Sequence, residues 1–207
     1  MDRVEPGQFE IEVQVLRRQR TITFVRATLL QQDRACVQAH AVLAASRTPA
    51  QAHFARSPAL GAPLGHPRLD ALEPLAAFPA MFEYRIASGW PGRTGQGAST
   101  AGFIRPRMER LVTPESLTML ADAWFPAFWA AGDRVPATTV SMALVFAGAQ
   151  AAVPLGEDEF LQAGFRTSAA AGGFGDETGE LWWPDGRLAV SAQQLVRFSA
   201  PRDGAGR

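Results

Sequence analysis

The chain has 207 residues, a mass of 22.3 kDa and 47% hydrophobic residues, so it can bury one large core or two small ones. Twenty basic and twenty acidic side chains cancel without a run of either sign, which argues against a nucleic-acid-binding or membrane-surface protein. The single cysteine, Cys36, excludes an internal disulfide and a cysteine-rich zinc site.

No leader sequence opens the chain, and no apolar run is long enough to span a bilayer. We therefore expect a cytoplasmic protein.

Three strands are predicted before residue 46, with no helix between them. Residues 9–17, FEIEVQVLR, alternate between apolar and polar side chains, which is typical of a half-buried strand. The polar turn RRQR leads to a second strand at about residues 21–30, and the turn QQDR leads to a third at residues 35–45. The pattern predicts an antiparallel meander.

A long connector is predicted next. Residues 46–80 carry six prolines in an alanine-rich stretch with weak periodicity, and a connector of this length usually joins two units. We therefore expect a first unit at residues 1–45 and a second at residues 81–198. The last residues, 199–207, are predicted to be disordered.

The second unit is predicted to combine antiparallel strands with a single helix. Strands are expected at residues 81–88 and about 100–108 before the helix, and from about residue 138 and at about 160–170 after it. A glycine-rich loop is then expected to lead to a hairpin, in which LWW and RLAVSAQQLVRF flank a Pro-Asp-Gly turn at residues 184–186.

The helix is predicted over residues 113–131, TPESLTMLADAWFPAFWAA. Its apolar side chains cover nearly the whole circumference, which is typical of a buried helix. Asp122 is the only charge between Glu115 and Asp133. Pro126 cannot donate a backbone hydrogen bond to the carbonyl of Asp122, so the helix is expected to kink or loosen beside this carboxylate.

A curled antiparallel sheet wrapped around one helix fits this order of elements, which places the chain in the α+β class. That layout is the hotdog fold. Residues VEPGQFEIEVQVLRRQRTITFVRATLLQQDRACVQAHAVL resemble the latter half of the first module of type II bacterial acyl-CoA thioesterases, which are double hotdogs. LADAWFPA, TTVSMALVF and WPDGRLAVSAQQLVRF resemble the helix, the next strand and the last hairpin of their second module. The resemblance implies one complete hotdog module preceded by a partial one.

The resemblance also implies a catalytic set without metal or cofactor. In the family, an Asp on the helix, a Thr on the next strand and a Gln on the last strand hold the attacking water. They match Asp122, Thr139 and Gln194 here. Thr138 and Gln193 stay open as alternatives, because a slip of one residue turns a strand side chain to the opposite face.

The chemistry of hydrolysis suits this set. A carboxylate within reach of one water can act as a general base, and an apolar surround would raise its pKa towards useful strength. We expect Asp122 to be buried for this reason. Ser141 stands where many relatives carry a second Asp.

The chain has no G-x-S-x-G motif, which argues against a serine hydrolase of the α/β type. The three histidines (His40, His53 and His66) all precede the complete module, so an esterase-like role is favoured over a hotdog dehydratase, which by resemblance pairs a His with an acid.

We therefore predict hydrolysis of an acyl-CoA thioester to the free acid and coenzyme A. Arg105, Arg107 and Arg110 could meet the phosphates of coenzyme A or form a solvated charged strand end. Three strands without their helix would leave an apolar face open, which the second unit, a second copy of the chain or residues missing before the given start could cover. Hotdogs usually pair their sheets edge to edge, so a homo-oligomer is expected. The alternative is a non-catalytic acyl-binding or assembly module.

Overall fold

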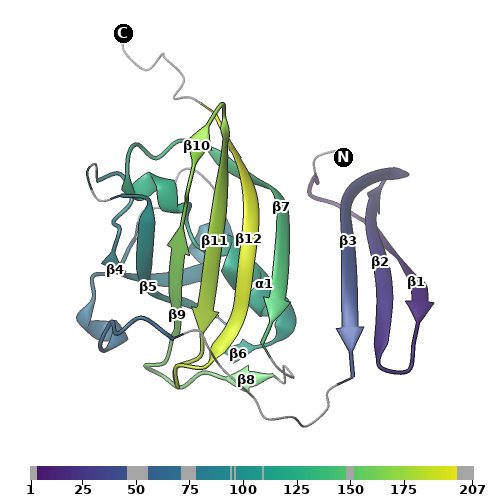
Figure 1. The fold of residues 1–207 in the computed structure, drawn as a ribbon, viewed down its shortest axis with the longest axis horizontal. Helices are drawn as coiled ribbons and strands as arrows, with labels where there is room; N and C mark the ends of the chain where they lie inside the picture. The colour runs from purple at the N-terminus through teal and green to yellow at the C-terminus, as the bar shows by residue number, and fades with distance from the viewer. Residues whose placement is uncertain are drawn as a thin grey trace. The chain divides into compact units, whose positions relative to one another are not determined.

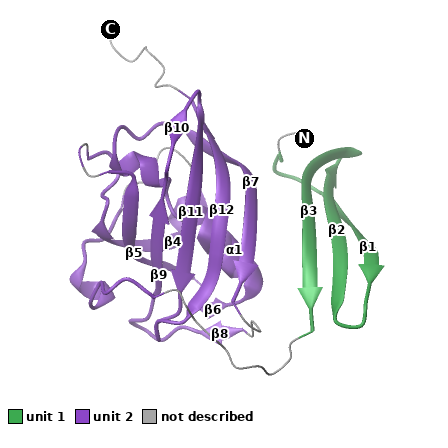
Figure 2. Cartoon of the chain, in the orientation of Figure 1, with its two compact units in different colours: residues 1–50 green, residues 51–207 purple. Residues whose placement is uncertain are grey.

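The computed structural model describes residues 4–45, 56–70, 78–93, 95, 97–108, 110–147 and 152–199. It divides the chain into two compact units, residues 1–50 and 51–207 (Figure 2). Two parts of the predicted connector, residues 46–55 with His53 and residues 71–77, lie outside the described residues, and so does the predicted tail beyond Ser199. No helix in the described ranges is long and apolar enough to cross a bilayer.

The first unit is the predicted three-stranded antiparallel meander (Figure 1). Its strands are β1 (Glu10–Arg18), β2 (Ile22–Gln31) and β3 (Arg34–Ala44), in the order β1-β2-β3. The register places Ile11 opposite Leu29 and Leu29 opposite Val37, so the apolar side chains of all three strands share one face.

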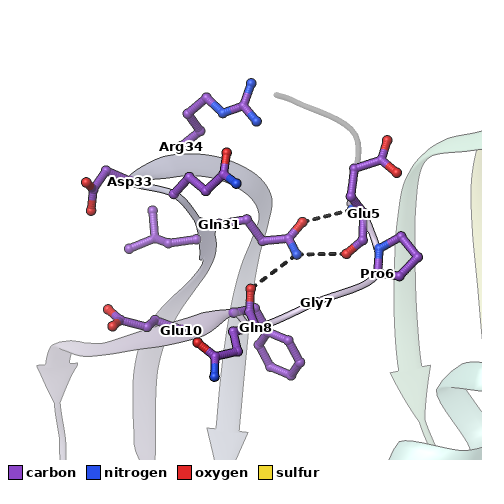
Figure 3. Close-up of a pocket in the computed structure, with 11 residues that line it drawn as sticks. Glu5, Pro6, Gly7, Gln8, Glu10, Gln31, Asp33 and Arg34 are labelled. Atoms are coloured by element: carbon purple, nitrogen blue, oxygen red, sulfur yellow. Dashed lines mark hydrogen bonds between the residues drawn. The ribbon is translucent and has the colours of Figure 1, made fainter.

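A buried amide ties the segment before β1 to the end of β2. Gln31 is only 9% exposed, and its Oε1 accepts a hydrogen bond from the backbone nitrogen of Glu5 at 2.8 Å. Its Nε2 donates to the carbonyl oxygens of Glu5 and Gln8, at 2.8 and 3.3 Å (Figure 3). These bonds satisfy the amide and stabilise the edge of a hollow of about 880 Å³ next to it.

The second unit contains a strongly curved antiparallel sheet in the order β4-β5-β9-β11-β12-β7 (Figure 1). These strands are β4 (Phe82–Ser88), β5 (Ser99–Pro106), β7 (Ala137–Phe146), β9 (Leu161–Arg166), β11 (Phe174–Trp182) and β12 (Leu188–Phe198). A short strand, β10 (Ala170–Ala171), pairs with β11, while β6 (Leu111–Val112) pairs with β8 (Val153–Pro154). The 3₁₀-helices are η1 (Pro63–Gly65), η2 (Phe78–Met81) and η3 (Ala127–Ala130).

The helix α1 (Pro114–Ala123) lies behind the sheet in Figure 1 and contacts β5, β7, β11 and β12. A capping box begins it, because Thr113 N donates to Ser116 Oγ at 2.6 Å and Ser116 N donates to Thr113 Oγ1 at 3.3 Å. Leu117 and Leu120 are fully buried in the core that the helix shares with the sheet. The predicted sheet around one central helix is therefore present.

The predicted helix over residues 113–131 is too long. α1 ends at Ala123, and Trp124 is already extended with ψ 134°. Pro126 explains the break, because it lacks an amide hydrogen and disfavours helical backbone in the residue before it. The indole of Trp124 stacks on Phe125 and donates to Thr100 Oγ1 at 2.8 Å. The chain therefore leaves the helix with its aromatic side chains still buried, and it resumes as η3.

The predicted glycine-rich loop is also wrong in part, because β11 begins at Phe174. Its inward-facing residues alternate as Gly175, Glu177, Gly179 and Leu181, so three of the four lack the apolar side chain that marks a strand in sequence. The small residue at 179 is required by packing. A Cβ there would lie 2.0 Å from the ring of Phe165 on β9.

Candidate active site

Asp122 lies one residue before the end of α1, where it lines a cavity of about 420 Å³. The expectation that its side chain is buried is wrong, since Asp122 is exposed. The physical reason is the early end of the helix, which leaves this carboxylate at the last turn and accessible to solvent. Asp122 can therefore meet a ligand or water without any movement of the helix.

Thr139 reaches Asp122 from β7. Its hydroxyl donates to Asp122 Oδ1 at 2.8 Å. A bulge sets this orientation, because Leu195 pairs with Ser141 and the next residue of β12 pairs with Thr139, which leaves Val140 without a partner on β12. Thr138 and Ser141 are consequently exposed while Thr139 is half-buried. The structure thus turns Thr139, and not Thr138, towards the carboxylate.

Gln194 completes the group from β12. It is 6% exposed, whereas the neighbouring Gln193 is exposed. Its Nε2 donates to the carbonyl oxygen of Ala121 at 3.2 Å, one of the last carbonyls of α1 that have no partner within the helix. Tyr84 donates likewise to the carbonyl of Ala123 at 2.9 Å. The end of α1 is therefore fixed by side chains from β4 and β12.

The hydrogen bonding leaves acceptors available in this cluster. Thr139 Oγ1 lies 2.8 Å from Asp122 Oδ1 and 3.1 Å from Gln194 Oε1, but a hydroxyl carries one proton and can donate it to only one of them. Asp122 Oδ2 makes no hydrogen bond to another described residue. The cluster thus presents a carboxylate oxygen and an amide oxygen that can each accept a proton from a further group.

The lining of the cavity combines polar, aromatic and smaller apolar residues. It includes Trp124, Phe125 and Trp129 beside Asp122 and Thr139. Its volume lies in the range of small-molecule sites in proteins. Neither described histidine lines it, and within the described ranges no group of three or more His, Cys, Asp or Glu side chains could hold a metal ion.

Glu177 is a site residue that the sequence did not reveal. It lies on β11 directly opposite Gln194, lines the same cavity and is 2% exposed. Its Oε2 accepts a hydrogen bond from the backbone nitrogen of Ala127 at 2.6 Å. Burial raises its pKa from 4.5 to about 8, helped by the negative charges of Asp122 and Asp176 and opposed by the Ala127 amide and the Thr167 hydroxyl. The signal in the sequence was an acid at an inward position of a glycine-rich strand.

Arg105, a candidate for binding phosphate, forms an ion pair within the sheet. Its guanidinium donates to Glu83 Oε2 at 3.0 and 2.7 Å and covers the ring of Phe160 at 4.0 Å. Although burial acts in the opposite direction, hydrogen bonds from Arg105 and Arg85 hold the pKa of Glu83 below its ordinary value. Arg107 is exposed. Arg105 therefore stabilises the sheet edge and offers little to a ligand.

Two family models together match most of the chain. A model of the acyl-CoA thioesterase C-terminal domain matches residues 54–198, and a model of the acyl-CoA thioesterase N-terminal domain matches residues 1–44. No curated protein matches the chain.

Among solved structures, a protein of unknown function with a hot dog fold from Alicyclobacillus acidocaldarius is 25% identical, with a TM-score of 0.83 over 93% of this chain and 73% of that one. A proposed thioesterase II from Thermobifida fusca is 24% identical, with a TM-score of 0.73 and the same coverage. An acyl-CoA thioesterase II, TesB2, from Mycobacterium marinum is 17% identical, with a TM-score of 0.69 over 94% of this chain and 75% of that one. The predicted α+β hotdog fold is confirmed by these likenesses.

Proposed function

The chain belongs to the acyl-CoA thioesterase family, and on that premise we propose that it hydrolyses an acyl-CoA thioester to the free acid and coenzyme A. The observation that carries this proposal is the contact of Asp122, Thr139 and Gln194 at one cavity. They come from α1, β7 and β12, so the sheet and its helix must both form before the cluster exists.

In the proposed mechanism a water molecule donates one hydrogen bond to Asp122 and the other to Gln194 Oε1. Thr139 donates its own proton to Asp122 Oδ1, which fixes the carboxylate and leaves Oδ2 to act as the base. The water oxygen then attacks the thioester carbonyl carbon while Asp122 takes its proton. A carbon–oxygen bond forms, the carbon–sulfur bond breaks as the tetrahedral intermediate collapses, and the proton passes from Asp122 to the departing thiolate.

The aromatic part of the lining supports an acyl substrate. Trp124, Phe125 and Trp129 supply apolar surface beside the polar cluster, so an acyl chain can leave water while its carbonyl faces Asp122. The exposure of Asp122 suits this arrangement, because the large coenzyme A portion can stay outside the cavity.

Release of free thiol tests the proposal. The wild-type chain is expected to release coenzyme A from at least one member of a panel of acyl-CoAs that runs from short to long acyl groups. The alternative, a non-catalytic acyl-binding or assembly module, predicts saturable binding by calorimetry without thiol release at any chain length. Binding without release from the whole panel would therefore exclude hydrolysis.

The cytoplasmic location and the homo-oligomer stay predictions. The second is supported within the first unit, where Val13 and Val15 on the apolar face of the meander are 66% and 51% exposed. Light scattering coupled to size-exclusion chromatography tests it, and a monomer at all concentrations would exclude it.

A further inference from the structure

Glu177 is the one buried acid of the cavity, and the mechanism above does not use it. It stands directly across from Gln194 on the neighbouring strand, so the two side chains lie side by side on the inner face of the sheet. It is 2% exposed and lines the cavity together with Asp122. Burial of a carboxyl group at this position is destabilising unless its oxygens are hydrogen-bonded. The hydrogen-bond partners of Glu177 therefore indicate its role.

The surroundings of Glu177 favour its neutral form. The charged groups that act on it are Asp122 from α1 and Asp176 from its own strand, and both are negative. No arginine among the described residues lines the cavity to balance a second negative charge. Two carboxylates that share one site do not both ionise readily, so the more deeply buried one keeps its proton.

The hydrogen bonds locate that proton. Glu177 Oε2 already accepts from the backbone nitrogen of Ala127, so the oxygen that carries the proton is Oε1. The Thr167 hydroxyl also acts on this carboxyl group and lowers its pKa, but it makes no hydrogen bond of ordinary geometry with it. No other described residue accepts a hydrogen bond from Oε1. A donor that stays unsatisfied inside a protein is destabilising, so the acceptor is expected to come from whatever occupies the cavity.

The other donors near the cavity are in use or out of reach. Thr139 gives its only proton to Asp122, and Gln194 Nε2 donates to the end of α1. The indole nitrogen of Trp129 has no partner among the described residues, but that atom is itself fully buried. Thr138 also lines the cavity with a hydroxyl, but its side chain is exposed to solvent. The hydroxyl of a neutral Glu177 is thus the buried side-chain donor that remains for the oxygen of a ligand.

We propose that Glu177 acts as a neutral carboxylic acid that donates a hydrogen bond from Oε1 to the carbonyl oxygen of the bound thioester. This inference rests on the proposed hydrolysis and deepens it, because the same bond strengthens as the carbonyl oxygen becomes an oxyanion in the tetrahedral intermediate. Glu177 forms no covalent bond, and its proton returns fully to Oε1 when the intermediate collapses.

A purely structural role makes a different prediction. If Glu177 only holds the amide of Ala127, it fixes the start of η3 after Pro126 and has no preference for a ligand that contains a carbonyl. Two variants separate the roles. Glu177→Gln keeps an acceptor and a donor but cannot titrate, whereas Glu177→Met keeps the length of the side chain and removes both.

The test uses two matched coenzyme A derivatives that cannot be hydrolysed. One is a ketone in which a methylene group replaces the sulfur, and the other is an alkyl thioether without the carbonyl. By calorimetry, the wild type is expected to bind the ketone roughly 5–10-fold more tightly than the thioether, as one added hydrogen bond allows. Glu177→Gln should keep this ratio, and Glu177→Met should reduce it to about one. An unchanged ratio in Glu177→Met would overturn the inference.

Kinetics add a second readout. Loss of one oxyanion donor typically lowers kcat by about 10²–10³-fold. The kcat of Glu177→Met should therefore fall by this amount, and the kcat of Glu177→Gln should fall by roughly tenfold or less. The ketone preference of the wild type should disappear as the pH rises above about 8, where Glu177 ionises, and should persist in Glu177→Gln. This comparison decides the question if Glu177→Met does not fold, and a persistent wild-type preference at high pH would overturn the inference.

The two proposals fail separately. A wild type that releases no thiol but loses its ketone preference on Glu177→Met would contradict the hydrolysis and leave carbonyl recognition by Glu177 intact. A wild type that releases thiol with a ratio independent of Glu177 would contradict this inference alone. Absence of thiol release from the whole panel, together with absence of binding by both derivatives, would overturn both.

Discussion

The protonation of Glu177 makes the stability of the fold depend on pH in a direction opposite to that of an ordinary carboxylate. Its pKa rises from 4.5 to about 8 on folding, because of burial and the nearby negative charges. Between these values the folded state holds a proton that the unfolded state has released. The stabilisation is therefore fully present below pH 4.5 and is lost as the pH rises through about 8.

The size of the effect follows from one proton. Within that window the free energy of unfolding falls by about 1.4 kcal/mol per pH unit, or about 3 kcal/mol between about pH 5.5 and pH 7.5. A loss of this size is a large part of the roughly 5–15 kcal/mol that stabilises a typical domain. Glu83 and Asp176 have lowered pKa values, so their stabilisation is lost only as the pH falls, and they do not contribute to this slope.

Urea unfolding at a series of pH values measures the slope directly. Glu177→Gln removes the titrating group and should lower the slope relative to the wild type by about 1.4 kcal/mol per pH unit. Glu180→Gln is the matched control, because residue 180 lies on the same strand but on its other face, and it should keep the wild-type slope. Equal slopes in wild type and Glu177→Gln would refute a protonated Glu177.

Three other substitutions test the structure around the site. Thr139→Val removes the donor to Asp122 and should lower kcat by roughly 10–100-fold, and an unchanged kcat would remove this hydroxyl from the mechanism. Gln194→Leu leaves the helix carbonyl without its donor and should destabilise the fold by about 1–3 kcal/mol in urea, whereas Gln193→Leu on the exposed face should change it by about 0.5 kcal/mol or less. Gly179→Ala places a Cβ 2.0 Å from a phenylalanine ring and should cost about 1–3 kcal/mol or more, and an unchanged unfolding midpoint would contradict that packing.

The strands were largely predictable because their sequences alternate between apolar and polar side chains, which located β1 and β12 to within a residue or two. In β12 this alternation matches alternating burial, but the expectation of a half-buried β1 is wrong, because every residue of β1 is exposed. Alternation could not choose between Thr138 and Thr139. The bulge at Val140 decides that choice, and a bulge depends on pairing with β12 that a single strand's sequence does not contain.

Two features of the site escaped prediction for physical reasons. The apolar run through Trp124 and Trp129 gave the impression of a continuous helix, but Pro126 breaks it and exposes Asp122. Glu177 was not predicted because the inward-facing positions next to it on β11 are glycines. Glycine has no apolar side chain, so the strand lacks the alternating pattern that would have identified it. Tertiary packing, here the phenylalanine ring that covers Gly179, selected those small residues.

The central claim is that Asp122 activates water for attack on the thioester. Its most direct test is kcat for thiol release by Asp122→Asn, compared with Asp133→Asn, an exposed aspartate that does not line the cavity. The account predicts a fall of about 10²–10⁴-fold for Asp122→Asn at an unchanged unfolding midpoint, and wild-type release by the control. Equal release by wild type and Asp122→Asn would contradict it.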